Sequence, residues 1–100
     1  MAGALIHEAV FGDILGEAIS AYKKHGVLTD EPVRACAIMV REAGEALNEA
    51  LLMTSPKLSR FDNKQKYIDA LYTELAQVAA TAAMIMTTIR EENELGKAGA

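Results

Sequence analysis

This sequence is poor in the residues that build disulfide scaffolds and large aromatic cores. It has one cysteine, Cys36, no tryptophan and only five aromatic residues among 100. A lone cysteine excludes an internal disulfide framework, which favours a cytoplasmic setting. Apolar and polar residues alternate nowhere for long, and this argues against β-strands. These absences leave an all-α chain.

The sequence also lacks an excess of positive charge and a long apolar run. Fourteen acidic and ten basic residues give a net charge of −4, which argues against nucleic acid as a partner. The N-terminal residues reach an acid, Glu8, without a preceding basic region, so no signal peptide is predicted. The uncharged stretch 75–89 is shorter than the ~20 residues that span a bilayer. We therefore expect a buried helix there, and no membrane partner.

What is present is helical periodicity in three segments. Apolar residues recur at helical spacing from about Ala4 to Lys24, from a cap at 29–32 to about Met53, and from about Asn63 to Leu95. Gly26, the run 54–56 and Gly96 are the expected ends, and the third helix is expected to break near Thr87-Thr88. We predict one domain over 1–100 with a flexible tail at about 96–100. Its fold is an antiparallel bundle of three to five helices, completed by oligomerisation because three helices cannot cover every side of 75–89.

The second helix has two contrasting sides. At 100° per residue one stripe is apolar, and it consists of Val33, Cys36, Val40, Ala43, Gly44, Leu47 and Leu51. The nearly opposite line is acidic and holds Glu31, Glu42, Glu45 and Glu49. Ile38 and Leu52 lie on that acidic line, which indicates acids in a cleft between apolar walls or at a subunit boundary. Cys36, on the apolar stripe, is predicted to be buried and inert.

The acidic line has three interpretations. Clustered carboxylates could hold a hard cation such as Mg²⁺ together with polar groups of the third helix, where Glu74, Gln77, Thr81 and Thr88 share a side. Salt bridges to Arg34 and Arg41 would neutralise them as well, and a simple solvated face is the third reading. Alanines at 76, 79, 80, 82 and 83 keep the third helix thin, so that another helix can approach closely.

Other candidates for chemistry are few. His7 and His25 lack metal-type spacing, so surface or core placement is expected. The basic residues near the start of the third helix are Lys57, Arg60, Lys64 and Lys66. They could reach a phosphate chain, Lys64 and Lys66 above all, or could keep the connection solvated.

Two short motifs resemble those of the MazG-like branch of the all-α nucleoside triphosphate pyrophosphohydrolases. They are residues 41–51 (REAGEALNEAL) and 74–80 (ELAQVAA), and the similarity covers about residues 5 to 90. The resemblance implies a homodimer or homotetramer that uses Mg²⁺ to cleave a nucleoside triphosphate into the monophosphate and pyrophosphate. It implies Glu42, Glu45 and Glu74 as metal ligands, with Gln77 at a further ligand position. Glu45 or Glu49 would orient or deprotonate the attacking water.

The sequence departs from the family pattern at two positions. Arg41 stands where the first of two adjacent acids is usual, and Gln77 stands where the second motif usually ends in Asp. Loss of an anionic ligand should weaken Mg²⁺ binding and activation of water. The alternative function is therefore a weak or inactive module on the same scaffold that binds nucleotides or other proteins.

Overall fold

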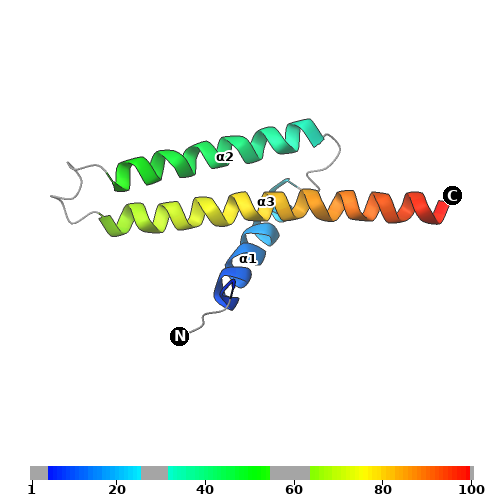
Figure 1. The fold of residues 1–100 in the computed structure, drawn as a ribbon, viewed down its shortest axis with the longest axis horizontal. Helices are drawn as coiled ribbons and strands as arrows, with labels where there is room; N and C mark the ends of the chain where they lie inside the picture. The colour runs from blue at the N-terminus through cyan, green and yellow to red at the C-terminus, as the bar shows by residue number, and fades with distance from the viewer. Residues whose placement is uncertain (1–4, 26–31, 55–63, 100) are drawn as a thin grey trace.

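The computed structural model describes residues 5–25, 32–54 and 64–99, and every regular element within these ranges is an α-helix. The helices are α1 (Glu8–His25), α2 (Pro32–Met53) and α3 (Lys64–Gly99). The all-α prediction is confirmed. α2 and α3 lie side by side and antiparallel, while α1 crosses α3 at a steep angle (Figure 1). The C-terminal part of α3 extends beyond the start of α2.

The N-terminal end of α1 differs from the prediction. Residues 5–7 are not helical and the helix begins at Glu8, so a start near Ala4 is wrong. The backbone N–H of Ala9 donates to Nδ1 of His7 at 3.1 Å, and the His7 ring thus satisfies one of the free amides of the first turn. His7 is therefore a capping residue at the N-terminal end of α1.

The boundaries of α2 agree with the prediction at both described ends. Pro32 occupies the first turn, where its missing N–H costs little. After Met53, the Thr54 hydroxyl donates to the carbonyls of Ala50 at 3.1 Å and Leu51 at 3.2 Å. These bonds satisfy carbonyls that the end of the helix leaves free. The expected signals at 26, 29–31 and 55–63 lie outside the described residues.

α3 is longer than predicted and uninterrupted. It continues from Lys64 to Gly99, so the expected break near Thr87-Thr88 and the expected end at Gly96 are both wrong. The Thr87 hydroxyl donates to the Ala83 carbonyl at 2.8 Å, one turn earlier on the same helix. This bond lets a threonine stay inside a helix without breaking it.

The contact between the helices is built mainly from small side chains. The buried residues are Ala35 and Ala46 of α2, and Ala76, Ala80, Thr81 and Ile85 of α3. Alanines allow two helix backbones to approach closely, so the prediction of a thin third helix is confirmed. Among the described residues none of the larger side chains is fully buried.

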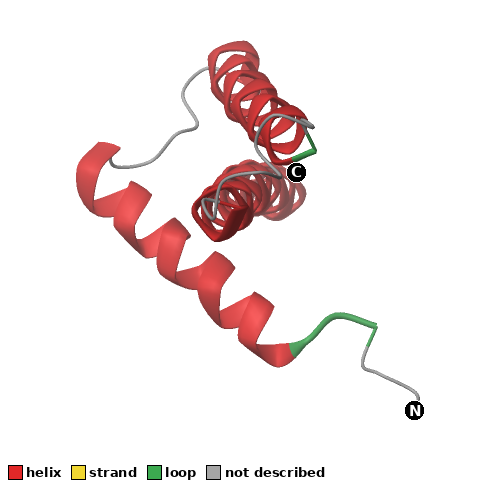
Figure 2. Cartoon of the chain, turned by 90° about the vertical axis from the view of Figure 1, so that its left-hand side faces the viewer, coloured by secondary structure: helices red, strands yellow, loops and turns green. Residues whose placement is uncertain are grey.

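Most large apolar side chains lie outside this contact. On α2 the apolar stripe faces away from α3: Val33 is 84% exposed, Val40 67%, Leu47 62% and Leu51 61%. Cys36 lies on the same stripe and is exposed, so its predicted burial is wrong. α1 and α3 carry further exposed apolar residues. Figure 2 shows α1 and α2 on different sides of α3. None of the described helices is both long enough and apolar enough to cross a membrane.

Candidate functional site

The acidic side of α2 faces α3. Glu42 and Glu49 are half-buried and Glu45 is exposed at the margin of the contact. Ile38, also half-buried, shares the same side of the helix. Of the two arrangements left open by the sequence, a cleft and a subunit boundary, the chain places these acids between its own second and third helices.

One hydrogen bond fixes Glu42 against α3. The hydroxyl of Thr81 donates to Oε1 of Glu42 at 2.8 Å, and Thr81 is only 4% exposed. A buried hydroxyl needs a partner, and a carboxylate gives a stronger hydrogen bond than a neutral acceptor. Helical spacing placed Thr81 on the same side as Glu74, but the pairing across the two helices had no signal in the sequence.

Among the acids of this cluster, Glu74 has a raised pKa. Its Oε2 is buried and has no hydrogen-bond partner among the described residues. Desolvation raises the pKa of its carboxyl above the ordinary value of 4.5, and the Glu45 carboxyl adds to this by its charge and by hydrogen bonding. The charges of Glu42 and Glu49 raise the pKa further. These effects show that the acids of α2 surround Glu74 closely enough to repel its negative charge.

The remaining predicted site residues differ in their distance from Glu74 along α3. Gln77 is half-buried one turn after Glu74, on the side of α3 that faces α2. Lys66 is exposed and lies eight residues before Glu74, about 12 Å along the helix axis. The Lys64 side chain lies outside the described residues. Lys66 is therefore not brought to the glutamates by the fold of this chain.

The salt-bridge reading of the acids finds no support in the described ranges. Both Arg34 and Arg41 are exposed, and neither forms an ion pair with the glutamates there. The ion pair that these ranges contain joins Arg90 and Glu94 on the solvent side of α3, at 3.2 Å. Among the described residues, no cationic side chain pairs with the negative charge at the contact.

The chemistry of these acidic side chains suits a cation, but their present positions do not. Carboxylate oxygens are the donors that Mg²⁺ prefers, and the buried Oε2 of Glu74 has no hydrogen-bond partner among the described residues. Within the described parts of the chain, however, no three acids, histidines or cysteines converge closely enough to hold a metal ion. Side-chain movement within the cluster would be needed to complete a set of ligands.

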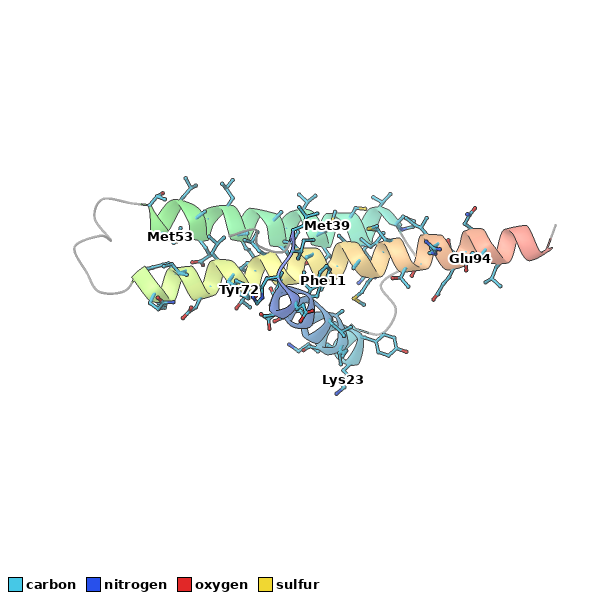
Figure 3. The ribbon with its side chains drawn as sticks, turned by 60° about the horizontal axis from the view of Figure 1, so that its bottom comes forward. Phe11, Lys23, Met39, Met53, Tyr72 and Glu94 are labelled. Atoms are coloured by element: carbon cyan, nitrogen blue, oxygen red, sulfur yellow. The ribbon has the colours of Figure 1, made fainter. Side chains whose placement is uncertain are left out.

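A second polar contact lies on the opposite side of α3. The Tyr72 hydroxyl donates to Asp13 of α1 where the two helices cross (Figure 3), and this bond raises the pKa of Tyr72. An open pocket of about 330 Å³ lies beside it, lined by Gly12, Gly16 and Ala76 among others. Sequence reasoning missed this pair, because nothing in either helix alone indicates how α1 crosses α3.

Comparison with known proteins adds no relative. No protein-family model matches the chain, and no curated protein and no solved structure is significantly similar to it.

Proposed function

We propose that the protein is a Mg²⁺-dependent nucleotide pyrophosphohydrolase of the MazG-like type, acting as a homodimer or homotetramer. It would convert a nucleoside or deoxynucleoside triphosphate and water into the monophosphate and pyrophosphate. The observation that carries the proposal is Glu74: its buried Oε2 has no hydrogen-bond partner in the described parts of the chain, and its pKa is raised by desolvation and by the acids of α2.

A cluster of carboxylates that repel one another is costly for a purely structural contact. The charges of three further acids act on the Glu74 carboxyl and raise its pKa. A leucine or an alanine at this position would pack without that repulsion. Such an arrangement is typical of sites where a cation or a reacting group balances the charge. The motifs at 41–51 and 74–80, which resemble those of the pyrophosphohydrolases, contain these same residues.

The roles proposed for these residues are those that the resemblance implies. Glu42, Glu45 and Glu74 would hold Mg²⁺ with Gln77 as a neutral ligand, and the ion would offset phosphate charge and lower the pKa of bound water. The Thr81 hydroxyl holds Glu42 in place. Glu45 or Glu49 would accept a proton from the water that attacks the α-phosphorus, while the bridging oxygen leaves with pyrophosphate.

Turnover of a nucleotide panel tests the proposal. The full chain is incubated with NTPs and dNTPs plus Mg²⁺, and pyrophosphate is measured. Glu45→Gln and Glu49→Gln keep the side-chain shape, and loss of the proton acceptor should lower kcat by about a hundredfold or more. Glu91→Gln, an exposed acid elsewhere on α3, is the matched control and should turn over normally.

The other candidate is a helical interaction module without catalysis. The specific observation in its favour is the set of exposed apolar side chains on every helix. If no nucleotide is cleaved faster by the unmodified chain than by Glu42→Gln, the enzymatic proposal is wrong and this alternative stands.

A further inference from the structure

The outward side of α2 carries a regular apolar seam. It repeats at alternating steps of three and four residues, and we call it the outer seam: Val33, Cys36, Val40, Ala43, Leu47 and Ala50. Five of these residues are exposed and Ala50 is half-buried. Spacing of this kind, sustained here over 18 residues, is the pattern by which one helix packs along another.

The residues on either side of the outer seam carry no charge that would repel a partner helix. One flank is formed by Ala37, Gly44 and Leu51, and the other by Met39, Ala46 and Met53, so neither flank carries a charge. Gly44 leaves open space, since a Cβ added there would meet no atom within 4 Å. A second helix can therefore come close without desolvating a charged group.

The chain exposes more surface than a compact monomer of its size. Its accessible surface is 7813 Å² for 10.7 kDa, whereas a folded monomer of that mass exposes about 5,500 Å². The difference, about 2,300 Å², exceeds the ~800 Å² that each partner buries in a standard interface. The area left open is thus sufficient for stable association.

The order of large and small residues along the seam indicates what covers it. Every first position of a heptad is large (Val33, Val40, Leu47) and every fourth position is small (Cys36, Ala43, Ala50). When two copies run antiparallel, first positions face fourth positions, so each layer pairs a large side chain with a small one. A parallel pair would instead alternate crowded layers with hollow ones. The seam is self-complementary in the antiparallel sense only.

We propose that the outer seam of α2 joins two copies of this chain as an antiparallel helix pair. Leu47 of one copy packs against Cys36 of the other, Val40 against Ala43, and Val33 against Ala50. Antiparallel helix dipoles favour the same orientation. The pairing needs neither a nucleotide nor a metal, and it leaves the glutamate side of α2 free, because that side already faces α3 of the same chain.

Sedimentation with paired variants tests which surface associates. Leu47→Glu places two charges in the symmetric contact and should raise the dimer dissociation constant by about a hundredfold or more. Leu15→Glu on α1 is the matched control, since Leu15 is 61% exposed and Leu47 is 62% exposed. The proposal is overturned if the unmodified chain is monomeric at micromolar concentration, or if Leu15→Glu dissociates the dimer and Leu47→Glu does not.

Disulfide trapping tests the orientation and does not depend on loss of a fold. Leu47→Cys places a second thiol opposite Cys36 of the other copy, so mild oxidation should give a covalent dimer. The unmodified chain, whose two Cys36 residues lie apart in this arrangement, should stay uncrosslinked, and so should Leu15→Cys. Efficient Cys36–Cys36 crosslinking of the unmodified chain would show a parallel pair and overturn the proposal.

Discussion

The two sides of α2 show opposite relations between polarity and burial. The side against α3 carries Glu42 and Glu49, which lose water on packing, while the side toward solvent carries Val40 and Leu47, which gain nothing there. A helix selected only for the stability of a single chain would be turned the other way round. Because acids face α3 and apolar residues face solvent, hydrophobic burial alone does not explain the contact of α2 with α3.

Under the two proposals, each side of α2 awaits something that a single chain does not supply. For the apolar side it would be a second copy, and for the acidic side it would be a cation and a phosphate chain. The small buried side chain of Ala46 lies on the side of α2 that meets α3, where the Thr81 hydroxyl donates to Glu42. Variants that alter the charge or the bonding of the inner side test this reading directly.

Among variants judged by cation binding and stability, the largest effect on the inner side is expected from Gln77→Asp. The change adds a carboxylate one turn after Glu74, and a further anionic ligand should lower the dissociation constant for Mg²⁺ by about tenfold, or 1.4 kcal/mol. Without Mg²⁺ the same variant should be less stable, because another negative charge joins the cluster. Calorimetric titration and thermal unfolding measure the two effects.

Gln77→Asn is the control for this comparison, since it has the shape of Asp without its charge. It should leave Mg²⁺ binding and stability close to those of the unmodified chain. Equal Mg²⁺ affinity for Asp and Asn at this position would mean that residue 77 is not at the cation.

A smaller effect is expected from Thr81→Val. Valine fills the same volume but cannot donate to Glu42, so a half-buried carboxylate loses its hydrogen bond at the helix contact. The free energy of unfolding should fall by about 1–2 kcal/mol, as measured by urea denaturation. Thr87→Val removes a hydroxyl bonded to the backbone of its own helix on the exposed side, and it should cost less than about 0.5 kcal/mol. Similar losses for the two variants would show that the Thr81–Glu42 bond is of no special importance.

The sequence predicted the helices better than their orientation. Periodicity located α2 at both ends, and small residues correctly indicated close packing of α3. The start of α1 was wrong because a histidine caps it, and capping by His7 has no strong sequence signal. The end of α3 was wrong because Gly96 is common after helices but is also tolerated within them.

The orientation of α2 was harder to predict for a physical reason. Periodicity separates an apolar line from an acidic line, but which line faces the next helix depends on residues far away in the sequence. Here it depends on the partners that α3 offers, among them Thr81 and Glu74. Cys36 was misplaced for that reason, since it was assigned to the core together with the apolar stripe.

The smallest effect, and the one most specific to the inner side, is the pH dependence caused by Glu74. Because its pKa is raised on folding from 4.5, the folded chain holds this proton more tightly than the unfolded chain does. Its contribution to stability is therefore favourable at acidic pH and is lost as the pH rises from about 4.5 through the raised pKa. At pH 7 and without Mg²⁺, Glu74→Gln should raise the melting temperature by a few degrees, with little change at pH 4. Added Mg²⁺ should stabilise the unmodified chain and not the variant, whereas a solvated surface acid would give no difference between them under any of these conditions.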